Sequence, residues 1–398
     1  MRYLSVFLAT TAGVSALATP RAPSNIEQLI ARQKASTYGA DRLAGRALEN
    51  LVEYANREGT IHKRQAECTP ETADVRKEWS ELTDAEKKEY IAAVQCISTA
   101  PSIGTDVFSG ARTRYDDFVG THIAQSLTIH GTANFLSWHR YYTWLYEQAL
   151  KNECGYTGAQ PYWNWGMWAE DPLNSPIFDG SDTSMSGDGA YREHPSLNMA
   201  GKMYNPANGG DCITEGPFVN FTVNLGPGQK LYDFVADNPG ADHLGYNPRC
   251  IIRDINKEVS MDSTQDHHTT DLIENYNDIV SFQDRMQAVQ PGFFGVHGGG
   301  HYTHGGDPGG DFYTSPGDPV FYLHHAMIDR VWTTWQNLDP DQRTYAVGGS
   351  VGAMFGGFDQ QQQEGTLDDP LDLMVVGDTI TIRDASSTLG GSFCYIYT

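Results

Sequence analysis

The chain has 398 residues, and its 27 lysine and arginine residues against 50 aspartate and glutamate residues give a formal net charge of −23. Its 39% hydrophobic and 11% aromatic residues are typical of a globular protein and exclude a disordered or fibrous one. Phosphate backbones and anionic membrane surfaces repel so acidic a chain. We therefore expect no nucleic-acid partner and no membrane partner, and small molecules remain as candidate ligands.

The first residues have the pattern of a secretory signal peptide. Arg2 supplies a positive charge, residues 4–14 are mostly apolar, and Ala16-Leu17-Ala18 has the small residues of a cleavage site. The apolar run is well short of the roughly 20 residues that a membrane-spanning helix needs. We predict that residues 1–18 are removed and that the protein is secreted and extracellular.

A dibasic pair, Lys63-Arg64, indicates a second processing site. It lies in a polar stretch and precedes all six cysteines. Endoproteases of the secretory pathway cut at such pairs, so residues 19–64 are predicted to be a pro-segment. The remaining residues, 65–398, are predicted to form one catalytic domain.

The cysteines predict disulfides, because an exported chain passes through oxidising compartments. The sequence cannot choose among the possible pairings, although we expect Cys68 and Cys394 to tie the two ends of the mature chain together. Asn220-Phe221-Thr222 is an acceptor triplet for N-glycosylation, which suits a surface loop.

Helical patterns appear at a few places, separated by long loops. Thr83-Asp84-Ala85-Glu86 has the form of a capping box and opens a helix. An aromatic stripe predicts a second helix over residues 135–150. Residues 171–250 and 303–319 are rich in turn-forming residues, and residues 373–397 alternate like short strands. These patterns favour helices held in a loop-rich body.

The histidines are clustered. The first group is His122, His130 and His139, and the second is His297, His301 and the adjacent His324-His325. Histidines four residues apart share one face of a helix, and three converging imidazoles are enough to hold a first-row metal. An isolated histidine is usually a hydrogen-bonded core or surface residue, but two such triads are hard to explain in that way.

The neighbours of these histidines narrow the kind of metal. Neither group brings a nearby carboxylate in a facial triad or zinc-protease pattern, and neither includes a cysteine. Between His297 and His301 stand three glycines, each costing a helix about 1 kcal/mol relative to alanine. Such a cost is expected at a functional site, where the missing side chains leave space for a flat substrate. A glycine-rich loop with accidental histidines is the alternative.

Several motifs together resemble the type-3 copper proteins, the family of tyrosinase and catechol oxidase (polyphenol oxidase), in its short secreted fungal form. The matching segments are Tyr115-Asp116-Asp117-Phe118, the run from Phe135 to Tyr141, Pro161-Tyr162-Trp163-Asn164-Trp165, Asn247-Pro248-Arg249-Cys250, and the run from Ser315 through His324-His325 to Trp332. They cover most of residues 72–398.

The resemblance implies a mainly α fold in which an antiparallel four-helix bundle holds a dicopper centre, with long loops and a few short strands. His122, His130 and His139 would bind copper A, and the copper B ligands would be His297, His301 and His325. His324 would stand behind the ligands. Tyr395-Ile396-Tyr397 resembles the motif that closes the family's core domain, so a C-terminal shielding domain is not expected.

The activity implied by the resemblance is oxidation of o-diphenols to o-quinones, with two copper ions as cofactor and O2 as co-substrate. Relatives that hydroxylate monophenols often carry Asn after the first copper B ligand and a nearby Glu, where this chain has Gly298 and Gln287. Glutamine is no base at neutral pH, so we expect weak or no hydroxylation of unactivated monophenols. Tyr302 is expected to gate ring substituents.

Two further positions bear on the site. Phe321 is expected either to stack on the histidines or substrate or to be plain core. Thr128 stands where many relatives carry a cysteine linked to the histidine two residues on, so no such cross-link is expected. His304, His194, His243 and His267-His268 are expected to be loop or surface groups.

Other functions remain open at this point. The chain could be a true tyrosinase with monophenol hydroxylase activity, or, in a different class, a dicopper oxygen-binding protein or a structural protein without turnover. Small phenols are the expected partners of an enzyme, and a monomer or a weak dimer is compatible with the sequence.

Overall fold

The computed structural model describes residues 25–61, 68–199, 201–352 and 363–398. The predicted signal peptide and the Lys63-Arg64 pair lie outside these residues. The α-helices are α1 (Asn25–Lys34), α2 (Gly39–Ile61), α3 (Asp84–Ile97), α4 (Arg114–Gln125), α5 (Phe135–Cys154), α6 (Trp165–Trp168), α7 (Lys257–Ser263), α8 (Asp266–Asn275), α9 (Ile279–Met286), α10 (Gly295–His304), α11 (Val320–Asn337) and α12 (Pro340–Arg343).

The strands are short and form small separate sheets. They are β1 (Asp74–Arg76), β2 (Gly189–Tyr191), β3 (Leu197–Met199), β4 (Lys202–Tyr204), β5 (Gly210–Ile213), β6 (Ile252–Arg253), β7 (Ser350–Val351), β8 (Gln363–Glu364), β9 (Pro370–Leu371), β10 (Ile380–Thr381) and β11 (Tyr395–Tyr397). The sheet orders are β1-β11, β10-β9, β2-β5-β6, β3-β4 and β7-β8. The predicted mainly α fold with a few short strands is confirmed.

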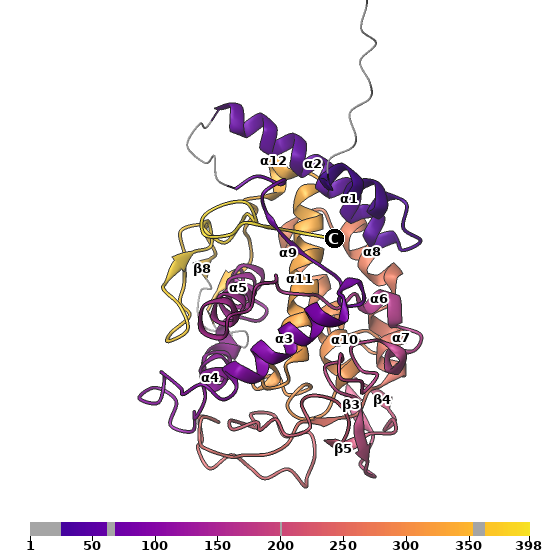
Figure 1. Cartoon of the computed structure of the whole chain (residues 1–398), viewed down its shortest axis with the longest axis vertical. Helices are drawn as coiled ribbons and strands as arrows, with labels where there is room; N and C mark the ends of the chain where they lie inside the picture. Colours follow the sequence, from indigo (N-terminus) through magenta and orange to yellow (C-terminus); the bar gives the residue numbers. More distant parts are fainter. Residues whose placement is uncertain (1–24, 62–67, 200, 353–362) are drawn as a thin grey trace, which may run out of the picture.

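Four helices, α4, α5, α10 and α11, form the central bundle (Figure 1). Every residue of α11 is buried, and this helix packs against both α5 and α10. The link from α4 to α5 is made by Tyr142, whose hydroxyl donates to the carbonyl of Phe118 at 2.8 Å. The bundle therefore brings four helices that carry histidines to one core.

Local signals in the sequence explain where the helices begin and end. Thr83 caps α3, and both hydrogen bonds of the capping box with Glu86 are present. The helix expected over residues 135–150 is α5, which continues to Cys154 and ends at Gly155 in the left-handed conformation, with φ 69°. Both predicted helices are confirmed.

The two ends of the chain after the dibasic pair lie together. β1 pairs in parallel with β11, with Asp74 opposite Tyr395, and the expected disulfide between Cys68 and Cys394 is present. The other disulfides join Cys96 to Cys154 and Cys212 to Cys250. Of residues 373–397, only β10 and β11 are strands, because the segment between them forms turns that hydrogen-bond within themselves.

A buried ionic network fastens β1 and β11 to the bundle. Asp329 on α11 accepts hydrogen bonds from the hydroxyls of Tyr395 and Tyr397, each at 2.6 Å, and from Arg140 Nε on α5 at 2.5 Å. Arg76 on β1 lies 3.4 Å from the same carboxylate. The tyrosine motif thus acts through Asp329, which ties two helices of the bundle together.

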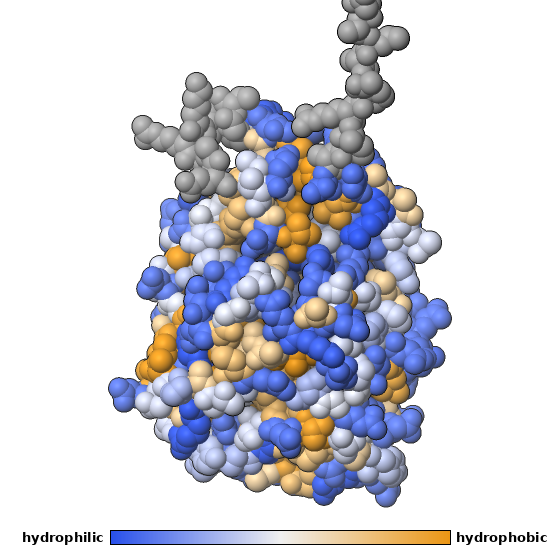
Figure 2. All heavy atoms as spheres, in the orientation of Figure 1, coloured by the Kyte–Doolittle hydropathy of each residue, from blue (hydrophilic) through white to orange (hydrophobic). Residues whose placement is uncertain are grey.

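Helices α1 and α2 form a hairpin that lies at the top of the molecule in Figure 1, against α8 and α11. The face of the molecule drawn in Figure 2 is mostly polar, with hydrophobic residues in small separate patches. Within the described residues, no helix is long and apolar enough to cross a membrane.

Candidate metal centre

The first histidine group converges inside the bundle. His122 comes from α4, His139 from α5 and His130 from the loop between them, and one ring nitrogen of each lies within 4.8 Å of the others. Each Nδ1 is 2.8 Å from a backbone carbonyl: that of Tyr313 for His122, that of Ser126 for His130 and that of Phe135 for His139. These contacts fix the tautomer, because Nδ1 donates and Nε2 is left free as a lone-pair donor.

The second group faces the first from the other half of the bundle. His297 and His301 lie on α10, and His324 and His325 lie on α11, with one ring nitrogen of each within 4.8 Å of the others. The Nε2 atoms of His301 and His325 are 3.2 Å apart. The ring of His325 also stacks on that of His139, with centroids 4.6 Å apart, so the two groups form one continuous cluster of imidazoles.

Burial keeps these imidazoles neutral. It lowers the pKa of His122 and of His324 to about 3 and that of His130 to about 4, and it also lowers the pKa of the other four. Neutral imidazole is the form that binds a metal ion. At neutral pH the groups are therefore ready to coordinate.

The cluster fits metal ions because its nitrogens lack other partners. Buried ring nitrogens without a hydrogen bond include Nε2 of His122, of His139 and of His297. A buried polar atom without a partner costs about 1–3 kcal/mol, and metal coordination removes that cost. Two buried all-nitrogen donor sets suit copper or zinc rather than magnesium or calcium, which prefer oxygen.

Phe321 packs on the histidines rather than on the cavity described below. Its ring stacks on His325 with centroids 4.1 Å apart and meets His122 edge-on at 5.4 Å. It is fully buried and belongs to the main hydrophobic core, so Phe321 is both a core residue and a contact of rings from the two groups.

The three glycines between His297 and His301 on α10 serve different structural purposes. A Cβ at Gly300 would lie 2.2 Å from Cε1 of His324, and one at Gly299 would lie 2.4 Å from Cβ of Ser263, so both allow close packing of helices. A Cβ at Gly298 would meet only Phe294, at 3.2 Å. Of the three, only Gly298 lines the cavity, so it alone leaves open space beside the histidines.

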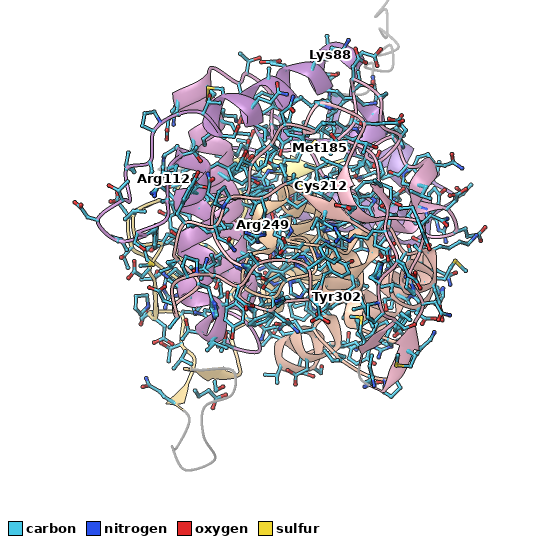
Figure 3. All side chains as sticks on the ribbon, turned by 90° about the horizontal axis from the view of Figure 1, so that it is seen from below. Lys88, Arg112, Met185, Cys212, Arg249 and Tyr302 are labelled. Atoms are coloured by element: carbon cyan, nitrogen blue, oxygen red, sulfur yellow. A yellow bond between two sulfur atoms is a disulfide. The ribbon has the colours of Figure 1, made fainter. Side chains whose placement is uncertain are left out.

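A cavity of about 300 Å³ opens beside His130, His297 and His301. Its other walls come from β3, from α10, from the loop between β5 and β6 and from the loops on either side of α10. They are mostly apolar: Leu197, Met199, Leu231, Val289, Phe294, Tyr302 and Phe312. Tyr302, which Figure 3 labels, is one of the lining residues, and its role as a gate stays a prediction. The ring of Phe312 is 4.7 Å from that of His130.

Gln287 also lines the cavity, and its amide is already engaged. The backbone N–H of Gly131 donates to Oε1 at 2.9 Å, and Nε2 donates to the carbonyl of Gln283 at 3.4 Å. Gly131 follows His130 directly, so Gln287 positions the loop that carries this histidine.

Two expectations about other histidines are wrong. His304 is the last residue of α10 and fully buried, with its Nδ1 3.7 Å from Asp318. His194 is buried with Nε2 3.2 Å from Asp254. Asp318 lies beyond the loop that follows His304, and Asp254 lies much further along the chain from His194, so neither contact leaves a local pattern. His267 is exposed, as expected, whereas His268 and His243 are half-buried.

No cysteine of this chain is available for the cysteine–histidine cross-link that many relatives have two residues before the second copper A ligand. All six are in disulfides, and Thr128 donates to the carbonyl of Gln125 at 2.9 Å.

The sequence did not predict the cavity walls formed by β3 and by the loop at Phe312, nor the carbonyl of Tyr313 that orients His122. These residues lie in loop-rich stretches without periodicity, and only the aromatic pair Phe312-Tyr313 so close to the second group hinted at them.

Comparison with known proteins gives one family. The common central domain of tyrosinase matches residues 112–338. The tyrosinase-like protein orsC of Emericella nidulans is 42% identical over 306 residues, which are 72% of this chain and 80% of that protein. Tyrosinase P of Aspergillus terreus is 36% identical over 339 residues, 82% of this chain and 93% of the relative.

A solved structure supports the same family. A mutant polyphenol oxidase from Thermothelomyces thermophila superimposes with a TM-score of 0.82 at 35% identity, covering 90% of this chain and 97% of that chain. The family match spans more than half of the sequence and includes all six histidines of the two triads. The chain therefore belongs to the tyrosinase family.

Proposed function

We propose that this protein is a copper oxidase that uses O2 to oxidise o-diphenols to o-quinones, with weak or no hydroxylation of unactivated monophenols. The tyrosinase family implies a dinuclear copper centre. In our assignment His122, His130 and His139 hold copper A, and copper B is held by His297, His301 and His325. When bound, the pair of copper ions would supply the redox chemistry with O2.

The chain's own residues place and restrict the phenol. Gly298 leaves room for a ring beside His297, and Phe312 and Tyr302 form apolar walls around that space. A cavity of about 300 Å³ next to the histidines favours turnover of a small molecule over oxygen transport, which needs no substrate pocket.

The observation that carries the preference for diphenols concerns proton acceptors. Gln287 offers an amide where a base would be needed, and its Oε1 already accepts a hydrogen bond. The carboxylate among the described wall residues is Asp311, and both of its oxygens accept backbone N–H groups, from Gly228 at 2.7 Å and from Gln229 at 3.0 Å. The amide of Gln287 is no base at neutral pH, and Asp311 is buried with backbone N–H groups on both oxygens, so neither is positioned to take the proton of a monophenol.

The proposal is tested with a matched pair of substrates on the copper-loaded protein. We expect 4-methylcatechol to be oxidised at once, and p-cresol to react only after a lag and at least about 100-fold more slowly, as the loss of a general base predicts. Comparable initial rates without a lag would show a true tyrosinase instead.

Supplying the missing groups should create the second activity. In the double variant Gly298→Asn with Gln287→Glu, a carboxylate can still accept the Gly131 N–H. Among the described side chains, the new Cβ at residue 298 would meet Phe294, at 3.2 Å. The ratio of p-cresol to 4-methylcatechol oxidation should rise by at least about 10-fold, since a positioned base contributes roughly 100- to 10,000-fold. Oxygen uptake measures both rates.

Gln229→Glu is the control, because Gln229 lines the same cavity and gains the same charge. Its ratio of activities should stay within about two-fold of the wild type, since its carboxylate does not stand beside Gly131. An equal gain in the control would mean that charge alone, and not a base at residue 287, promotes hydroxylation.

The walls also predict which diphenols bind well. Among the described residues that line the cavity there is no lysine or arginine, and the chain as a whole carries a net charge of −23. Uncharged catechols should therefore be preferred over those with a carboxylate. Val289→Arg, at a wall position that is 65% exposed, should lower the KM for 3,4-dihydroxyphenylpropionate about 2- to 5-fold relative to 4-methylcatechol, the size of an exposed ion pair.

Ile103→Arg provides the control for charge, since Ile103 is equally exposed, at 65%, and does not line the cavity. The relative KM should not change in this variant. If Ile103→Arg lowers it as much as Val289→Arg does, a general field and not the cavity wall selects the substrate.

A further inference from the structure

The α1–α2 hairpin is packed into the body of the protein. Its apolar side chains Ile26, Leu48 and Leu51 form one cluster with Ala73 and Ile396 from the two paired ends of the body. All five are at most 9% exposed. Removing the hairpin would expose apolar surface on both sides, at a cost of about 25 cal/mol per Å².

Polar contacts fix the hairpin at specific points of the bundle. Asp41 accepts from Arg330 on α11 at 2.8 Å and from Asn164 at 3.2 Å. The Arg330 side chain is 2% exposed, so it would lose a buried partner if the hairpin left. At the other side, the carboxylate of Asp266 accepts the backbone N–H groups of Gly39 and Ala40 at 2.6 and 3.0 Å.

Further along α2, the side chain of Asn50 donates to the carbonyls of Asn337 and Leu338, at 3.0 and 3.3 Å. These carbonyls lie at the end of α11, where a helix has no partners of its own for them. The hairpin therefore completes the helix that carries His325.

The hairpin lies far from the cavity. In Figure 1 it is at the top, whereas α10 and β3, which line the cavity, are in the lower half. No described residue of α1 or α2 lines the cavity. Covering the site is therefore not the task of this segment.

A related structure retains part of the same segment. The match to the solved polyphenol oxidase covers 90% of this chain, but the residues after Arg64 number only 398 − 64 = 334, or 84% of the chain. The match must therefore extend into the residues before the dibasic pair.

We propose that residues 25–61 are a permanent part of the folded enzyme, and that after a cut at Lys63-Arg64 they stay bound as a second, non-covalent chain that supports α11. The body begins at Cys68, which is anchored to Cys394 independently of the hairpin. A cut between them thus separates two segments that are each held in place. The predicted pro-segment is then a structural subunit and not a mask.

The test cuts the full chain. One version uses a dibasic-specific endoprotease, and the other uses a variant in which a sequence-specific protease site replaces residues 62–67. Native mass spectrometry and gel filtration at about 1 µM then detect the hairpin, which stays more than nine-tenths bound if its Kd is below about 0.01 µM. We expect the hairpin to co-migrate with the body. A free hairpin, whether the body stays folded or aggregates, overturns the proposal.

Variants on the two faces of α2 show which contacts hold the hairpin. Leu48→Ala with Leu51→Ala should weaken its binding to the cut body by at least 10-fold, whereas Arg46→Ala with Glu53→Ala, on the exposed face, should leave it unchanged. Equal binding of the two double variants would contradict the interface described.

The rate of 4-methylcatechol oxidation by the wild type should change less than two-fold on cutting, and a rise of 10-fold or more would identify a mask instead. The mass measurement does not depend on the proposed activity.

Discussion

His325→Asn is expected to lower the rate of catechol oxidation by more than about 1,000-fold, because metal catalysis supplies several kcal/mol. The same substitution at the adjacent His324 should cost only about 10- to 100-fold, as is usual for residues that support a ligand. The two substitutions make a stringent comparison, since both rings are buried and both belong to the second group.

The difference follows from where the two rings point. His325 stacks on His139, and its Nε2 is 3.2 Å from that of His301, so it is the member of the pair that faces the first group. His324 lies behind α10, against the backbone of Gly300, with its ring 5.2 Å from that of Trp165.

Copper content and catechol oxidation of both variants check this assignment. His325→Asn should retain about one copper ion per chain and His324→Asn about two, as expected for a ligand and for a residue that supports one. Loss of the second ion from His324→Asn alone would reverse the assignment.

Asp329→Asn is expected to destabilise the protein by about 3–5 kcal/mol, the usual cost of removing one partner from a buried ionic network. The substitution leaves the guanidinium groups of Arg140 and Arg76 inside the core without their shared carboxylate. Asparagine keeps only one oxygen, so it cannot accept both from Arg140, which bonds Oδ1, and from the hydroxyls of Tyr395 and Tyr397, which bond Oδ2. Denaturant unfolding measures the loss.

Asp341→Asn is the matched control, because Asp341 also pairs with an arginine but is 57% exposed. Exposed pairs contribute about 0–1 kcal/mol, so the control should unfold almost like the wild type. Similar losses in the two variants would mean that the buried network does not hold β1 and β11 to the bundle.

The same carboxylate predicts a dependence on pH. Burial alone would raise the pKa of Asp329, but the charges of Arg140 and Arg76 and the hydrogen bonds of the two tyrosines outweigh it and hold the pKa below its usual value. An aspartate in the unfolded chain titrates near about 3.9. The stabilisation is therefore complete above that pH and is lost as the pH falls through the lower folded pKa. The wild type should lose this increment in acid, whereas Asp329→Asn should not.

The histidines could be predicted from sequence because metal ligands need both a residue type and a spacing. His297 and His301 fall on one face of a helix by their separation alone, and α10 places them there. The choice between His324 and His325 was different. It required the family resemblance, because adjacent side chains leave a helix in different directions, and which of them faces the metal site depends on how α11 packs.

The walls of the cavity could not be predicted. Leu197 and Met199 come from a three-residue strand within a long loop-rich stretch, and they reach the cavity only through long-range packing. His304 and His194 look like loop or surface residues for a similar reason: their carboxylate neighbours, Asp318 and Asp254, come close only through folding and follow no periodic spacing.

The segment before the dibasic pair shows the limit of a local signal. Its basic, polar composition and the following Lys63-Arg64 suggest a removable leader, yet α1 and α2 bury Leu48 and Leu51 against the body. An amphipathic helix looks the same in sequence whether its apolar face is temporary or permanent, because the partner surface is formed by residues hundreds of positions away.

Copper titration of the full chain, followed by near-ultraviolet absorbance after addition of peroxide, tests the central claim most directly. With two triads of buried, neutral imidazoles facing one another, we predict two copper ions per chain and a strong new absorption band that appears only when both are bound. Binding of a single ion per chain, or two ions without the band, would contradict the assignment of these histidines to one dinuclear copper centre.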